Sequence, residues 1–222
     1  MATTAEVRRC TRLRGEPMRG RAAPERDSMS GTTNEGKEFM HYLSHYESPL
    51  GAMTMASDGE HLTGLWFDGQ KYDRSTIDDD AVLQPRLPVF TQTAQWLDAY
   101  FEGADPGFTP PISIEGSDFR KMVTSIMLSI PFGATSTYAR IAAEVARRTG
   151  RKQMSAQAVG GAVGHNPITL IVPCHRVLAS DGSLRGYAGG VVRKERLLEM
   201  EGVNMAGLST PPTADDGSGR RE

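Results

Sequence analysis

Short runs of alternating hydrophobic and polar residues appear early in the chain. They cover residues 41–44, 51–57 and 62–67, and turn sequences rich in Pro, Gly and Asp separate them. Side chains of a strand point alternately to its two faces, so this pattern predicts β-strands, and the tight turns predict antiparallel pairing. We therefore expect a small antiparallel sheet, with one further strand at residues 112–114.

The period then changes to that of a helix. Phe90, Ala94, Leu97 and Phe101 recur every three or four residues, which places them on one helical face. The spacing predicts a helix over residues 89–101 that packs on the sheet through this face.

A second group of helices is predicted after residue 116. The first follows Ser117, a good N-cap, and carries an apolar stripe as far as Ile130. The second begins near Thr137 and runs to Arg148, and Gly150 supplies a helix end.

A third short helix, capped by Ser155, covers residues 156–163. The turn before it is basic and contains Arg151 and Lys152. Two short helices joined by such a turn are a candidate helix-turn-helix, a pattern that also occurs in proteins that bind no DNA.

The chain therefore divides into four parts. Residues 1–37 and 206–222 lack hydrophobic periodicity and are expected to be a disordered leader and a disordered tail. Residues 38–115 form the predicted N-terminal α/β domain, and residues 116–205 form a mainly helical C-terminal domain. The expected fold class is mixed α/β (α+β).

Charge differs sharply between the two halves. Residues 40–118 hold 3 Lys/Arg against 13 Asp/Glu, net −10, whereas residues 119–202 hold 12 against 5, net +7. The second half is therefore suited to a polyanion such as DNA, although a basic face can also be merely solvated. No apolar run approaches the roughly 20 residues needed to span a membrane, so we expect an intracellular, cytoplasmic protein with no membrane partner.

One of the two cysteines lies in an unusual setting. Cys174 precedes His175 in the sequence Pro-Cys-His-Arg-Val, after an apolar, strand-like run over residues 168–172, whereas Cys10 stands alone in the leader. Two cysteines so far apart predict free thiols and a reducing compartment. A histidine and nearby basic residues favour the thiolate, which is the reactive form of cysteine.

This segment, with Asn166-Pro167 before it and Gly186-Tyr187-Ala188-Gly189-Gly190 after it, closely resembles the active site of the O6-alkylguanine-DNA alkyltransferases. The resemblance is strong over residues 88–204 and loose over residues 40–87. It implies a ribonuclease H-like N-terminal domain and a C-terminal domain that repairs double-stranded DNA carrying O6-alkylguanine. It leaves open whether O4-alkylthymine is a second substrate.

The resemblance also implies a set of catalytic roles. Cys174 is the acceptor of the alkyl group, in a reaction that each protein molecule performs once. His175 activates the thiol through a water and is held by Glu201, and Tyr138 contacts the base after it flips out of the duplex. Thiolate sulfur suits in-line attack on the ether carbon, and the target base must leave the stack to be reached.

Further residues are assigned to support or contact. Asn166 and Arg176 match structural residues of the family, and the third helix is expected to enter the minor groove. The expected substrate and DNA contacts are Arg151, Ala156, Gln157, Ala158, Gly160, Gly161, Val177, Tyr187, Ala188, Gly189 and Lys194.

The chain departs from the family pattern near Gln157. The family usually has an arginine there, which fills the gap left by the flipped base, and the turn before it is about five residues longer here. Gln157 carries no charge, so we expect it to hold the extrahelical state less firmly.

Three other functions are compatible with parts of this pattern. A non-catalytic sensor of alkylated bases shares this fold but replaces the cysteine, so Cys174 argues against it. In a cysteine hydrolase, Cys174 and His175 would form a dyad, but the expected distant histidine and the Gln/Cys-Gly sequence context are missing. A helix-turn-helix regulator would need a dimerisation segment and a polar recognition helix, and the sequence shows neither. We expect a monomer with no cofactor and no metal, since the five histidines show no ligand spacing with cysteines.

Overall fold

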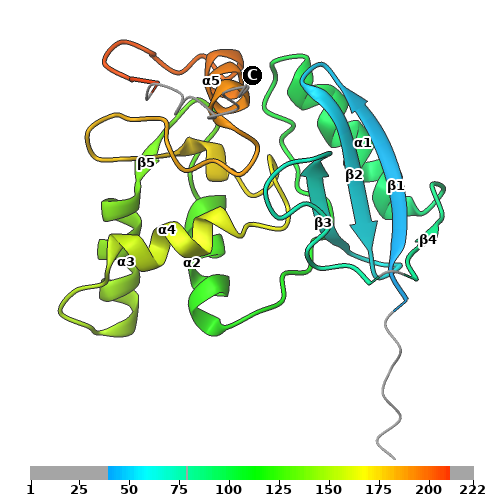
Figure 1. The fold of residues 1–222 in the computed structure, drawn as a ribbon, viewed down its shortest axis with the longest axis horizontal. Helices are drawn as coiled ribbons and strands as arrows, with labels where there is room; N and C mark the ends of the chain where they lie inside the picture. Colours follow the sequence, from blue (N-terminus) through cyan, green and yellow to red (C-terminus); the bar gives the residue numbers. More distant parts are fainter. Residues whose placement is uncertain (1–39, 79, 211–222) are drawn as a thin grey trace, which may run out of the picture. The chain divides into compact units, whose positions relative to one another are not determined.

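A computed structural model describes residues 40–78 and 80–210 (Figure 1). The predicted leader, residues 1–37, lies outside the described residues, as do residues 211–222 of the predicted tail. Within the described part, no helix combines the length and the hydrophobicity needed to cross a membrane.

The N-terminal half contains a four-stranded sheet with the strand order β3-β2-β1-β4. The first three strands pair antiparallel, as the alternating pattern predicted, and β4 pairs parallel with β1. Two residues are too few to show a period, so β4 could not be predicted. The strands are β1 (Tyr42–Ser48), β2 (Gly51–Ser57), β3 (Leu62–Phe67) and β4 (Val82–Leu83).

Helix α1 (Pro88–Phe101) packs against this sheet through Phe90 and Leu97, both almost fully buried (Figure 1). The strand predicted at residues 112–114 is wrong as an element. Only Ile112 forms a single bridge, with Leu62 of β3; Pro110 and Pro111 have no N–H with which to extend the pairing toward the N-terminus.

Three helices of the C-terminal half begin at a hydroxyl cap, which was predicted for Ser117 and Ser155, whereas Thr137 was predicted only as a helix start. The side chains of Ser117, Thr137 and Ser155 accept the backbone N–H groups three residues later. Gly150 ends the second helix in the left-handed conformation, at φ 66°. The helices are α2 (Asp118–Leu128), α3 (Tyr138–Thr149) and α4 (Ala156–Gly164).

Residues 168–172 do not form the strand that their composition suggested. Ile168 makes one bridge to Leu65, and the chain then turns, with Leu170 at φ 67°. The turn leads into the 3-10 helix η1 (Cys174–Arg176) and the short strand β6 (Val177–Leu178). Strand β6 pairs parallel with β5 (Ser136–Thr137) at the start of α3.

Helix α5 (Val191–Met200) follows, and the structure describes ten more residues after it, up to residue 210. Ser209 forms a bridge to Ser183, and Leu208 packs on the cluster formed by Leu178, Leu184 and Leu198. Residues 206–210 are therefore not part of a disordered tail, because one apolar side chain and one bridge attach them to the fold.

Hydrophobic side chains from both halves join one core cluster, including Phe67 and Leu97 from the first half and Val145, Val159 and Val172 from the second. The architecture confirms the predicted mixed α+β class. The predicted domain boundary between residues 115 and 116 stays a prediction.

Candidate functional site

Cys174 lies at the start of η1 and is only 5% exposed. The Asn166 side chain determines the path of the chain around it, because its Nδ2 donates to the Val172 carbonyl at 2.8 Å, to the Ile168 carbonyl at 3.2 Å and to Cys174 Sγ at 3.1 Å. One amide thus ties the end of α4, the turn and the sulfur together.

Burial raises the pKa of the Cys174 thiol above its ordinary value. Four groups oppose this effect: the Asn166 amide, the Thr169 hydroxyl 4.0 Å from Sγ, the charge of Lys194 and the backbone N–H of Cys174 itself. Burial prevails, so the resting residue is a thiol that must lose its proton before it can react.

His175 is fully buried next to Cys174. Its Nε2 lies 2.6 Å from Oε1 of Glu201. An ionised carboxylate only accepts hydrogen bonds, so Nε2 carries the ring proton. This leaves Nδ1 as an unprotonated nitrogen, and no described residue hydrogen-bonds to it. Burial also lowers the pKa of His175, which keeps the ring neutral.

Glu201, the C-cap of α5, receives donors from several segments. Arg176 donates Nε to Oε2 at 2.8 Å and Nη2 to Oε1 at 3.0 Å, and the Gly133 backbone N–H donates to Oε2 at 3.2 Å. Burial alone would raise the pKa of Glu201, but the bonds and charges of His175 and Arg176 outweigh it and hold the pKa at about 2.

Tyr100 of α1 is a member of this cluster that the sequence analysis missed. Its Oη donates to Glu201 Oε1 at 2.7 Å and lies 3.3 Å from His175 Nε2. Tyrosine in the apolar stripe of a helix usually serves as a core aromatic. The one available signal was that a buried tyrosine needs a partner for its hydroxyl.

Tyr138, at the first turn of α3, faces the loop that follows β6. Its Oη is 3.5 Å from the carbonyl oxygens of Arg185 and Gly186. A Cβ at Gly186 would lie 2.6 Å from that Oη, so only glycine permits this approach. Burial, followed by the charge of Cys174, raises the pKa of Tyr138 to about 12.

The same loop supplies Tyr187, whose ring is buried edge-on to the His175 ring. Its hydroxyl is 2.9 Å from Thr169 Oγ1, which connects it to the surroundings of the sulfur. Gly189 leaves room for this ring, since a Cβ there would lie 2.6 Å from it. The Ala188 carbonyl accepts the backbone N–H of Lys71 at 3.1 Å.

Lys194 is buried, and its ammonium donates to the Val177 carbonyl at 2.6 Å. Two residues predicted to contact substrate therefore contact each other. Burial lowers the pKa of Lys194 to about 8, while the nearby Cys174 charge opposes that shift. The ammonium is thus a buried cation near the sulfur.

The predicted DNA contacts Ala156, Gln157, Ala158, Gly160 and Gly161 lie on α4, apart from this buried cluster, and Arg151 is exposed in the turn before α4. Val159 and Val163 of α4 face the core. The opposite face is exposed and carries mostly small side chains, from Ala156, Gln157, Ala158 and Gly161. Gly160 is the residue of α4 that lies next to Tyr138, since a Cβ at Gly160 would be 3.9 Å from the Tyr138 ring.

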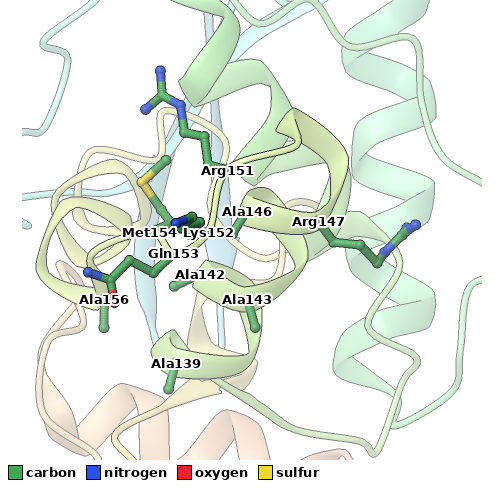
Figure 2. Close-up of a pocket in the computed structure, with 10 residues that line it drawn as sticks. All are labelled: Ala139, Ala142, Ala143, Ala146, Arg147, Arg151, Lys152, Gln153, Met154 and Ala156. Carbon is green, nitrogen blue, oxygen red and sulfur yellow. The ribbon is translucent and has the colours of Figure 1, made fainter.

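A hollow of about 450 Å³ lies beside the start of α4 (Figure 2). Alanines of α3 form much of its lining, and Figure 2 shows the side chains of Arg147 and Arg151 extending to different sides of it. Lys152 and Gln153 of the long turn complete the polar part of the lining. This surface is cationic and has a floor of small side chains.

Within the part of the chain that the structure describes, no three His, Cys, Asp or Glu side chains are placed to hold a metal ion. The buried polar groups gather instead around one thiol and one imidazole. That arrangement is suited to a nucleophilic reaction of Cys174 with His175 as its base.

Comparisons with known proteins cover most of the chain. Residues 41–114 match the family described as 6-O-methylguanine DNA methyltransferase, ribonuclease-like domain, and residues 118–203 match its DNA binding domain. The methylated-DNA--protein-cysteine methyltransferase of Mycobacterium tuberculosis is 39% identical over 163 residues, which are 73% of this chain and 93% of that protein. The protein of the same name from Methanosarcina barkeri is also 39% identical, over 74% of this chain and 99% of its own.

Solved structures agree with these matches. The crystal structure of Mycobacterium tuberculosis O6-methylguanine methyltransferase aligns with a TM-score of 0.63 at 39% identity, covering 73% of this chain and 93% of that one. The structure of Mycobacterium tuberculosis OGT in complex with DNA aligns with a TM-score of 0.62 at 38% identity, covering 72% and 92%.

Proposed function

Because the chain belongs to the 6-O-methylguanine DNA methyltransferase family, we propose that it repairs DNA by moving an alkyl group from O6-alkylguanine to Cys174. One observation carries the assignment of roles: a buried thiol held by Asn166 stands next to a buried His175–Glu201 pair. A non-catalytic sensor of the same fold would need no nucleophilic thiol at this position.

The proton path follows from the tautomer of His175. Glu201 holds the ring proton on Nε2, so Nδ1 is the basic nitrogen. We propose that a bridging water carries the Cys174 proton to Nδ1, which accepts no hydrogen bond from any residue that the structure describes. The cation of Lys194 and the amide of Asn166 then stabilise the thiolate.

The transfer itself exchanges one bond for another. The sulfur forms a bond to the alkyl carbon, the bond from that carbon to O6 breaks, and its electron pair remains on the guanine. The proton lost by the thiol balances the one that the guanine gains. Tyr138, a protonated phenol at neutral pH, is placed to donate a hydrogen bond to the departing base. The thioether has no comparable leaving group, so each molecule acts once.

DNA is the partner that the family and the basic half of the chain indicate. We propose that the small, exposed face of α4 enters the minor groove of a duplex and that the base flips into the space beside Tyr138 and Gly186. The cationic hollow near Arg151 would then lie along the phosphate backbone. A single chain carries every group in this scheme, so we propose a monomer acting inside the cell, at a nucleoid or nuclear genome.

Intact mass and peptide mapping test the assignment. After incubation with a duplex containing O6-methylguanine, the Cys174 peptide should gain one methylene, about 14 Da, in a one-to-one ratio with the repaired base. Cys174→Ser should abolish the transfer, whereas Cys10→Ser, the matched loss of the other thiol, should leave it intact. Repeated turnover, or methylation of another residue, would exclude the proposed reaction.

A further inference from the structure

We propose that Tyr100 is a positioning residue for alkyl transfer. Its hydroxyl donates a hydrogen bond to Glu201 Oε1, the same oxygen that accepts a hydrogen bond from His175 Nε2, and through this oxygen it sets how strongly the His175 ring binds a second proton. The inference rests on the proposed function. It assigns a role in the reaction to α1, a helix of the ribonuclease-like half of the chain.

The contact is specific in its atoms. Glu201 Oε1 accepts His175 Nε2 at 2.6 Å, Tyr100 Oη at 2.7 Å and Arg176 Nη2 at 3.0 Å. Tyr100 is 1% exposed, so water does not take the place of any of these donors. Hydrogen bonds to a buried charge are the strong ones, and removal of one changes the charge that the others meet.

Packing alone does not account for the hydroxyl. The Tyr100 ring stacks on Trp96 at 5.1 Å and meets Phe101 and Phe132 edge-on. A phenylalanine would keep all three contacts. The hydroxyl is the part of the side chain that reaches Glu201 and His175.

The two contacts of the hydroxyl oppose each other, and their lengths decide the outcome. Donation to Glu201 withdraws negative charge from Oε1 and so weakens the pull on a protonated His175. Acceptance from Nε2 would favour the protonated ring, but at 3.3 Å it is much weaker than the 2.7 Å bond. The net effect of the hydroxyl is to keep His175 unprotonated and ready to accept the thiol proton.

Several other groups face the imidazole, and none of them is changed chemically by the loss of the Tyr100 hydroxyl. Glu201 and Lys194 come from α5, and Cys174 and Arg176 from η1. Tyr187 lies edge-on at 6.4 Å. Removal of the Tyr100 hydroxyl therefore removes only its own contacts with Glu201 and His175.

The test is Tyr100→Phe, with Tyr46→Phe as the matched control. Tyr46 makes the same kind of bond, 2.8 Å from Oη to Asp98 of α1, but has no contact with His175 or Glu201 among those described. Rates are measured from pH 5 to pH 9 on free O6-benzylguanine, which needs no DNA binding. A nitrogen-15 NMR titration follows the His175 ring in the same full-length proteins.

We expect Tyr100→Phe to move the acidic limb of the rate profile and the His175 titration upward by about one pH unit. The rate on that limb falls roughly tenfold, while the plateau at higher pH is retained. Tyr46→Phe should move neither. Equal rate losses at every pH with an unmoved His175 titration, or an identical response of the two variants, would reduce Tyr100 to a packing residue. A wild-type protein that transfers no alkyl group would instead refute the proposed function, and the titration would still report on the Tyr100 contact.

Discussion

Glu201 accepts hydrogen bonds from several buried side chains, and its negative charge therefore contributes to the stability of the fold. Its pKa in the fold is about 2, against 4.5 for the ordinary carboxyl. A depressed pKa stabilises the fold when pH is above the unfolded value, and this contribution is lost as pH falls from 4.5 through 2. The shift corresponds to about 3 kcal/mol at neutral pH.

We therefore predict that Glu201→Gln lowers the free energy of unfolding by about 3 kcal/mol or more at pH 7, and that the deficit shrinks toward pH 3. Urea unfolding at several pH values measures it. Glu144→Gln is the control, because Arg147 and Arg148 also hold the pKa of Glu144 at about 2, but on the surface, where solvent screens the interaction. A deficit independent of pH would show that charge is not the cause.

At the residue scale, the local motif predicted Cys174 and His175 as catalytic residues, and their roles stay predictions; the structure buries both side chains. Tyr100 could not be found in this way. It is 75 residues from His175 and 101 from Glu201 along the chain, and the contact exists only because α1 packs beside η1 and the end of α5. A single sequence carries no signal of a pairing at that distance.

At the element scale, periodicity predicted the long strands and helices α1 to α4, and residue type predicted the hydroxyl caps Ser117 of α2 and Ser155 of α4. It failed where five or fewer residues are involved. Residues 168–172 are apolar enough for a strand, yet the Asn166 side chain takes the carbonyls of Ile168 and Val172 and bends the segment. Strands β4, β5 and β6 have two residues each and show no period.

Helix α4 gives a prediction that separates folding from DNA contact. Gly161 is exposed, and a Cβ there would meet nothing within 4 Å. Gly161→Leu should therefore keep or raise the melting temperature, since leucine is favoured over glycine in a helix by up to about 1 kcal/mol.

The same variant should repair duplex DNA at least roughly tenfold more slowly, because an added side chain prevents close approach to the groove. Its reaction with free O6-benzylguanine should be unchanged, which makes that substrate the internal control. Equal repair of the duplex by variant and wild type would exclude this face of α4 from the contact.

At the scale of the whole molecule, the described core is built from residues between 42 and 208. We predict that a chain shortened to begin at Asn34 keeps its melting temperature within about 2 °C and its rate of alkyl transfer within twofold, because residues 1–37 lack the apolar content to fold. Thermal unfolding and a single-turnover assay measure both. A large loss in either would assign the leader to the fold.

The burial of Cys174 has a consequence for how long the protein remains useful between lesions. In a protein that acts once, the number of intact thiols equals the number of bases that can still be repaired. Peroxides and disulfides attack exposed thiolates, whereas Cys174 is 5% exposed and its pKa is raised by burial. Burial of the sulfur therefore slows its oxidation, so a larger share of the molecules keeps an intact thiol until a lesion is met.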